Sequence, residues 1–237
     1  MQIASRQPMW SEGFAKGTVL VLRASTASMT AKISGGNLAD PNGIVTVDWG
    51  DGTSGEYRSF RDVTHTYSRA KNYKVKISDD LVSFGYTNYS YTGTGQRDMI
   101  LELKSLGSRV TSIEGYAFNN CHNMRGVINL PNVTSINGYA FGSTLGITDF
   151  ILPSMTRLVQ TSFYAAPSPT QMHADNVTQI DSRFWEYYGG HLADMYIGNR
   201  TCEQIKAMSG FPFRADASVR FHGSNGIVLG NGTIIHE

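Results

Sequence analysis

The side chains that could do chemistry in this chain are few and scattered. Its six histidines lie far apart in the sequence: His65, His122, His173, His191, His222 and His236. The sequence has no His-x-x-x-His or Cys-x-x-Cys spacing, no G-x-S-x-G motif and no phosphate-binding loop. These absences argue against a zinc site, a serine hydrolase and a nucleotide-binding enzyme. We therefore expect no enzyme activity, no catalytic residue, no metal and no cofactor.

One acidic turn brings together residue types that could hold calcium or act as a catalytic pair. Asp48 and Asp51 lie on either side of Trp49 and Gly50, and His65 follows in a later segment. The Asp51 carboxylate can instead accept hydrogen bonds from backbone amides of its own turn. We favour this structural role, with Trp49 in a core and His65 on a facing strand. A calcium site and a catalytic pair are the alternatives.

Composition narrows the classes of function further. The 237 residues include 20 basic and 19 acidic side chains, a net charge of +1, without a basic block. We therefore expect no nucleic-acid binding and no membrane insertion, since no stretch approaches the roughly 20 apolar residues of a membrane helix. Cys121 and Cys202 are the only cysteines, too few for a disulfide framework. The apolar run Thr18–Leu22 is too short for a signal-peptide core, so we expect no ordinary secretory signal if Met1 is the native start.

From Val110 to Gly198 the sequence repeats itself about every 22 residues. The repeats start at Val110, Val133, Met155 and Val177, and an aromatic follows eight residues after each start: Phe118, Phe141, Phe163 and Trp185. Apolar pairs precede the next start: Ile128 and Leu130, Phe150 and Leu152, Met172 and Ala174, Met195 and Ile197. A fixed period of this length predicts a solenoid, whose turns stack and share one core. We expect the aromatic residues to form one internal column.

The residues between the members of each apolar pair must point away from the core, because alternate residues of a strand face opposite sides. They are Asn129, Ile151, His173 and Tyr196. We interpret this outward ladder as a candidate binding surface. The alternatives are an ordinary solvent face or a face covered by the neighbouring domain. A second column, Asn132, Ser154, Asn176 and Asn199, follows the strands and fits Asn turns or a polar ladder better than a ligand site.

The first 97 residues lack this period and are typical of an antiparallel β-sandwich. Short β-prone runs alternate with Gly, Asn, Asp and Ser clusters: Val19–Leu22, Thr30–Ile33, Ile44–Trp49, Tyr73–Ile77 and Ser83–Tyr86. Val45, Val47 and Trp49 share one face of a strand, and Asp51-Gly52 favours a tight turn. We expect Trp49 to be buried in this sandwich.

Three segments of this half carry a family resemblance. They read V-T-V-D-W-G-D-G-T from Val45, H-T-Y from His65 and Y-K-V-K-I from Tyr73. In this order they resemble the polycystic-kidney-disease (PKD) type of immunoglobulin-like domain. Lys71-Asn72 replaces the family's usual glycine before the last strand, and Asn also tolerates left-handed geometry. The resemblance implies a non-enzymatic spacer or binding module.

The repeats carry a second resemblance. The pattern V-T-S-I-x-x-Y-A-F-x-x-C-x-x-M, followed by a strand that ends in Leu-Pro, is similar to BspA-like leucine-rich repeats. It covers roughly residues 100–200, and its third and fourth turns drift from the pattern. The resemblance implies adhesion or protein recognition without an active site. A PKD-like domain that precedes such repeats is a combination found in bacterial surface proteins and in proteins of gut bacteria and their phages.

The chain leaves the repeat after residue 200. Thr201-Cys-Glu-Gln204 fits a helix capping box, and Asn225-Gly226 and Asn231-Gly232 are hairpin signals. A helix and β-hairpins would cap the open end of the solenoid. The sequence thus predicts a mainly β fold: a PKD-like immunoglobulin-like sandwich over residues 1–97, a leucine-rich-repeat solenoid over 98–200 and a cap over 201–237.

The function expected from these features is a non-enzymatic surface adhesion or structural module. We favour a phage virion or tail-associated protein on the particle surface. A bacterial cell-surface or extracellular adhesin is the first alternative, and an intracellular protein-interaction scaffold is the second. Its partners would be other structural proteins of a particle, or a host-surface protein or glycan, and the chain could form a homo-oligomer. Met9, Trp10 and Phe14 are candidate docking residues, because a lone sandwich leaves such apolar groups partly uncovered.

Overall fold

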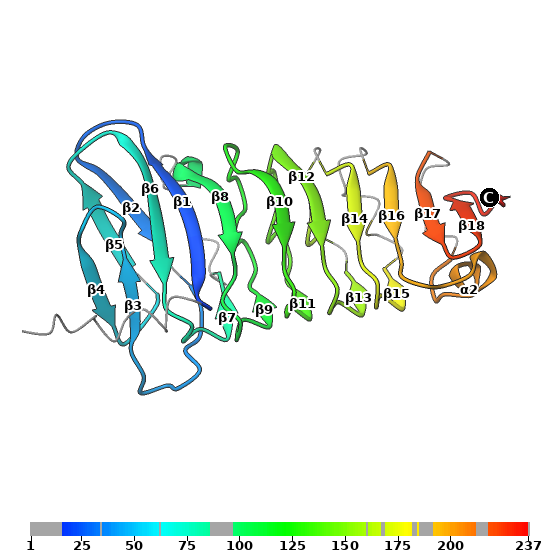
Figure 1. Cartoon of the computed structure of the whole chain (residues 1–237), viewed down its shortest axis with the longest axis horizontal. Coiled ribbons are helices and arrows are strands. Elements are labelled where there is room, and N and C mark those ends of the chain that lie inside the picture. The colour runs from blue at the N-terminus through cyan, green and yellow to red at the C-terminus, as the bar shows by residue number, and fades with distance from the viewer. Residues whose placement is uncertain are drawn as a thin grey trace, which may run out of the picture.

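The computed structural model is elongated and mainly β, with strands that follow one another along the long axis (Figure 1). It describes residues 16–33, 35–61, 63–85, 97–159, 161–166, 169–181, 184, 192–211 and 218–236. A β-sandwich lies at one end, a solenoid of stacked turns follows, and a short helix with a hairpin lies at the other end. The predicted fold class, mainly β with a solenoid, is confirmed.

Two antiparallel sheets form the sandwich. The larger has the strand order β4-β3-β6-β1-β8, and the smaller pairs β2 with β5. Their bounds are β1 (Thr18–Ala24), β2 (Met29–Ile33), β3 (Val45–Asp48), β4 (Ser54–Tyr57), β5 (Val63–Tyr67), β6 (Lys71–Ile77) and β8 (Ile100–Ser105). Trp49 is 2% exposed, so its predicted burial is confirmed. The Tyr67 ring is also buried and stacks on Tyr73 with ring centroids 3.8 Å apart.

The acidic turn after β3 is held together by its own side chains. The Asp51 carboxylate accepts hydrogen bonds from the Thr53 backbone amide at 3.0 Å and from Nε2 of His65 at 2.7 Å. The His65 ring stacks on Trp49 with centroids 4.8 Å apart. Partial burial acts to raise the pKa of Asp51, but the hydrogen bonds from Thr53 and His65 outweigh it and lower that pKa. This geometry supports a structural role for Asp51 and His65.

The long strands of the solenoid form the parallel part of a seven-stranded sheet. Its order is β10-β12-β14-β16-β17-β18-β19, and the pairs from β10 to β17 are parallel. The solenoid strands are β10 (Arg125–Asn129), β12 (Gly146–Ile151), β14 (Gln171–His173) and β16 (Asp194–Tyr196). The apolar pairs predicted to point inward are all fully buried: Ile128, Leu130, Phe150, Leu152, Met172, Ala174, Met195 and Ile197.

Two-residue strands form a second, narrower side of the solenoid. They are β7 (Ser83–Phe84), β9 (Ser112–Ile113), β11 (Ser135–Ile136), β13 (Arg157–Leu158) and β15 (Gln179–Ile180). They pair in parallel as β11-β9-β7 and β13-β15. Each short strand contributes one buried apolar residue, and each turn of the repeat contains one short strand. The repeat period of the sequence is therefore also the period of the structure.

The predicted internal aromatic column is confirmed for its three phenylalanines. Phe118 and Phe141 stack with centroids 5.1 Å apart, and Phe141 and Phe163 with centroids 5.9 Å apart. All three are buried. The predicted fourth member, Trp185, lies outside the described residues. Its neighbour Phe184 is buried and packs edge-on against Phe163, with centroids 5.8 Å apart.

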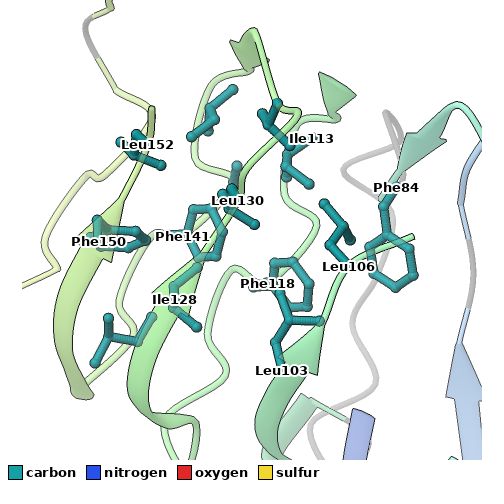
Figure 2. Packing of buried hydrophobic residues seen from close by; sticks show 14 of the residues in the cluster. Phe84, Leu103, Leu106, Ile113, Phe118, Ile128, Leu130, Phe141, Phe150 and Leu152 are labelled. Atoms are coloured by element: carbon teal, nitrogen blue, oxygen red, sulfur yellow. The ribbon is translucent and has the colours of Figure 1, made fainter. Parts of the chain in front are cut away.

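The sandwich supplies the solenoid with its first layer. Strand β7 pairs with β9, and Phe84 of β7 stacks on Phe118 with centroids 5.4 Å apart (Figure 2). Strand β8 lies beside β10 and extends the inner apolar wall with Leu103 (Figures 1 and 2). Gly85 permits the close approach: its φ is +113°, and a Cβ there would lie 2.4 Å from that of Ala117. The buried side chains of sandwich and solenoid accordingly form one continuous cluster.

The C-terminal cap begins with the predicted capping box. The Thr201 hydroxyl accepts from the Gln204 amide, the Gln204 side chain accepts from the Thr201 amide, and helix α2 (Cys202–Lys206) follows. Strands β17 (Arg220–Gly223), β18 (Gly226–Leu229) and β19 (Ile234–Ile235) then form the two expected hairpins. Strand β17 pairs in parallel with β16, so the cap continues the solenoid sheet. A single 3₁₀ turn, η1 (Arg97–Met99), precedes β8.

Candidate functional site

Two rows of side chains cross the outer face of the seven-stranded sheet. The first, which we call the outer row, contains Asn129, Ile151, His173, Tyr196, His222, Ile227 and Ile235. The second, which we call the charged row, contains Val127, Asp149, Gln171, Asp194, Arg220 and Leu229. The two rows lie two residues apart on each strand, because the residue between them points into the core.

The sequence predicted four members of the outer row, and the strand pairing places those four side by side. Asn129 is exposed, while Ile151, His173 and Tyr196 are half-buried. His222, Ile227 and Ile235 were not predicted as members. Their strands were expected from the hairpin signals, but nothing in the sequence showed that the cap would join the solenoid sheet in register with Tyr196.

Three rings at the centre of the outer row form a continuous stack. The rings of His173 and Tyr196 lie 4.4 Å apart with planes 4° from parallel, and those of Tyr196 and His222 lie 4.4 Å apart at 15°. Strand spacing in a sheet, about 4.8 Å, brings flat rings on neighbouring strands into contact. Because the ring faces cover one another, the stack presents the edges of its rings at the surface.

Asp194 of the charged row fixes one end of this stack. His222 donates from Nε2 to the Asp194 carboxylate at 2.6 Å, and Arg220 donates to its other oxygen at 2.7 Å. Asp194 is buried, at 7% exposure, and this burial acts to raise its pKa. The hydrogen bonds from His222 and Arg220, together with their charges, outweigh burial and lower the pKa of Asp194. The carboxylate therefore holds the cap strand β17 against the last repeat strand β16.

Several polar groups of the two rows have no hydrogen-bond partner among the residues that the structure describes. Among the residues that the structure describes, the side chains of Asn129, Gln171, His173 and Tyr196 make no hydrogen bond. Polar groups that are at least partly exposed and make no hydrogen bond are available to bind a partner.

The column of Asn and Ser residues after the strands behaves differently. Asn132 donates to the Ser108 carbonyl, Ser154 to the Pro131 carbonyl and Asn176 to the Pro153 carbonyl. These bonds tie each turn to the one before it, so this column is the structural polar ladder that the sequence favoured. For Asn199 the structure records no such bond among the described residues.

Exposed apolar side chains extend the outer face. Among the described residues, four large hydrophobic side chains are exposed: Ile44, Val127, Leu145 and Ile235. Val127, at 49% exposure, belongs to the charged row, and Ile235, at 46%, ends the outer row. Exposed apolar groups beside unpaired polar groups are typical of a recognition surface.

Other residues singled out from the sequence do not form a second site. Cys121 and Cys202 are free and buried, and desolvation raises the pKa of Cys121 to about 12, which suits an inert core thiol. No group of three His, Cys, Asp or Glu side chains in the described ranges converges to hold a metal ion. Met9, Trp10 and Phe14 lie outside those ranges. None of the described helices is both long and apolar enough to span a bilayer.

Comparison with protein families identifies the repeat region. Residues 97–209 match the family model for the BspA type leucine rich repeat region, in six copies. The match covers the long strands of the solenoid, the short strands from β9 to β15 and helix α2. Searches of the curated proteins and of the solved structures found no significant match. BspA-type repeats are protein-interaction or adhesion modules, usually on bacterial surfaces or extracellular.

Proposed function

We propose that this protein is a non-enzymatic adhesion module whose outer row is its recognition surface. The observation that carries the proposal is the central stack of His173, Tyr196 and His222, with unpaired polar groups beside it. Such a face offers flat rings, hydrogen-bonding edges and little net charge. These are the features of the central part of a protein–protein interface, where aromatic residues are enriched and charges are depleted.

The solenoid suits this role because it fixes the rows rigidly. Parallel pairing holds successive side chains in register, and Phe150 of β12 packs edge-on against Phe141 and Phe163 of the buried column. A rigid surface loses little conformational entropy when a partner binds. The sandwich continues the face at one end, since β8 lies beside β10 (Figure 1).

The PKD-type relationship of the sandwich is part of the same proposal. Support comes from the buried Trp49, the Asp51–His65 contact and the Tyr67–Tyr73 stack, which involve the residues that carry the resemblance. A PKD-like module would act as a spacer that holds the solenoid away from its attachment point. It would itself add no active site.

The favoured location is the surface of a phage particle, as a virion or tail-associated component, and the alternative is a bacterial cell surface. The pairing of a PKD-like module with BspA-type repeats supports an exposed location in either case. Mass spectrometry of purified phage particles and of washed cell envelopes from the source culture separates the two. Presence in particles supports the first and presence in envelopes the second. Recovery only from the cytosol would contradict both and favour an intracellular scaffold.

A further inference from the structure

Four Asn-Gly pairs give this chain a reaction that needs no enzyme. Their asparagines are Asn42, Asn137, Asn225 and Asn231, and all four pairs lie within the described residues. In such a pair the backbone nitrogen of the glycine can attack Cγ of the asparagine side chain. Glycine favours the attack, because it has no side chain to block it and can adopt a wide range of backbone conformations. The four sites share the same reactive pair, so their surroundings in the fold decide which of them reacts.

The reaction consumes water and no other reagent. Attack on Cγ forms a new C–N bond and closes a succinimide ring. The bond from Cγ to the side-chain nitrogen breaks, and this nitrogen leaves as ammonia with the proton of the glycine amide. One water molecule then opens the ring at either carbonyl and yields aspartate or isoaspartate. Because the side-chain amide must turn toward the following backbone nitrogen, hydrogen bonds that fix this amide slow the reaction.

The two asparagines of the C-terminal cap have hydrogen-bonded side chains. Oδ1 of Asn225 accepts from the Cys202 backbone amide at 2.8 Å, and the amide nitrogen of the same side chain donates to the Glu203 carboxylate at 3.4 Å. Oδ1 of Asn231 accepts from the Thr233 backbone amide at 3.0 Å. Cyclisation at either site must first break these bonds.

The asparagine of the solenoid is also held. Asn137 donates from its side-chain nitrogen to the Glu114 carboxylate of the preceding turn at 2.9 Å, and its Oδ1 accepts from the Ser135 hydroxyl at 3.4 Å. Asn137 is half-buried. Its side chain therefore has to leave two contacts before it can reach the nitrogen of Gly138.

The side chain of Asn42 differs from the other three. Asn42 lies in the loop before β3 and is exposed, as are its neighbours Pro41 and Ile44. Among the residues that the structure describes, its side-chain amide makes no hydrogen bond. This amide is therefore free to turn toward the backbone nitrogen of Gly43.

The attacking backbone nitrogens are held alike in the loop before β3 and in the turn after β18. Gly43 donates its amide proton to the Asp40 carbonyl at 2.9 Å, and Gly232 donates to the Leu229 carbonyl at 2.8 Å. Each nitrogen must leave the same kind of turn bond before it attacks. The difference between these two sites thus lies in the asparagine side chain.

We propose that the pair Asn42-Gly43 is a site of spontaneous deamidation in the folded protein, and that the fold protects the other three Asn-Gly pairs. The new carboxylate adds one negative charge, so the formal net charge of +1 falls to zero. Isoaspartate would lengthen the backbone only in the loop before β3, outside the paired residues of β2 and β3. The modification is therefore compatible with the intact fold, and it does not depend on the proposed function.

The test compares the four sites within one full-length chain. The protein is incubated at mildly alkaline pH, once folded and once in denaturant, and mass spectrometry of its peptides follows the conversion of each asparagine with time. Isoelectric focusing follows the more acidic form of the intact chain. Asn42→Gln removes the reactive site, and Asn231→Gln is the matched control at another exposed Asn-Gly pair.

We expect Asn42 of the folded protein to convert about tenfold or more faster than any of the other three asparagines, and all four to convert at similar rates in denaturant. Asn42→Gln should not gain the acidic form, and Asn231→Gln should gain it at the parent rate. Conversion of another Asn-Gly pair in the folded chain as fast as that of Asn42 would overturn the inference. No conversion at Asn42, or the same order of rates in the folded and the denatured chain, would also overturn it.

Discussion

The rings of Phe84 and Phe118 stack with centroids 5.4 Å apart and planes 12° from parallel. Phe84 comes from the sandwich half of the chain and Phe118 from the first turn of the repeat. The contact makes Phe84 the first member of the phenylalanine column that runs on through Phe141 and Phe163. The sandwich thus covers the apolar end of the solenoid that would otherwise face water.

We expect Phe84→Ala to destabilise the sandwich and the solenoid together. Removal of a fully buried phenylalanine costs about 3–5 kcal/mol, and Phe84 is 3% exposed. Chemical denaturation followed by tryptophan fluorescence and by far-UV circular dichroism should show one transition with a lowered midpoint. Val127→Ala, at an exposed position, is the control and should change stability by less than about 0.5 kcal/mol. Two separate transitions in Phe84→Ala, or an unchanged midpoint, would contradict the shared core.

Trp49→Ala should destabilise the protein through the sandwich core. The side chain is buried and stacks on His65, so we expect a loss of about 3–5 kcal/mol. Thermal unfolding measures the effect. A variant that unfolds at the temperature of the parent would show that Trp49 contributes little to this core.

Phe141→Ala should loosen the turns on both of its sides. Its ring contacts Phe118 in the preceding turn and Phe163 in the following one. Amide hydrogen exchange should become faster at Phe118, which bonds to the Ala140 carbonyl, and at Ser143, which bonds to the Tyr164 carbonyl. The amides of β3 serve as an internal control and should exchange at the parent rate. Faster exchange on one side alone would contradict the stacked column.

The Asp194 carboxylate should make cap stability depend on pH in the acid range. Its pKa is lowered in the folded state, so its contribution is present above the ordinary carboxyl pKa of about 3.9 and is lost as pH falls through the lowered value. Asp194→Asn should cost about 1–3 kcal/mol at pH 7. The gap in unfolding temperature between parent and variant should close as pH falls below 4. A gap that stays constant from pH 7 to pH 2 would refute this role of the carboxylate.

Much of the solenoid was predictable because the same pattern of inward and outward residues recurs in each of its turns. The inward pairs, the phenylalanine column and the Asn and Ser ladder all follow from a period of about 22 residues and from the alternation of a strand. Trp49 and the Thr201–Gln204 capping box were predictable for a similar reason, since each depends on residues close in sequence.

The contacts that join the solenoid to the sandwich and to the C-terminal cap were not predictable in the same way. Strand β8 precedes the first repeat start at Val110, and its place between β1 and β10 depends on contacts across the fold. The same holds for Phe84, which stands in a segment without the period. His222 joins the outer row only because β17 pairs in register with β16 after an intervening helix. The repeat period predicts the structure of a single turn. It does not predict how the two ends of the solenoid pack against the sandwich and the cap, because those contacts join segments that lack the period.

The central claim is that the outer row is the surface by which the protein recognises its partner. The most direct measurement is saturable binding of the labelled full chain to intact cells and phage particles of the source culture, for the parent, Tyr196→Ala and Tyr139→Ala. Both variants remove one ring from a tyrosine-containing stack, but only Tyr196 lies in the outer row. We predict that Tyr196→Ala lowers the affinity about tenfold or more and that Tyr139→Ala binds like the parent. Equal binding by all three proteins, with the fold of each intact, would contradict the claim.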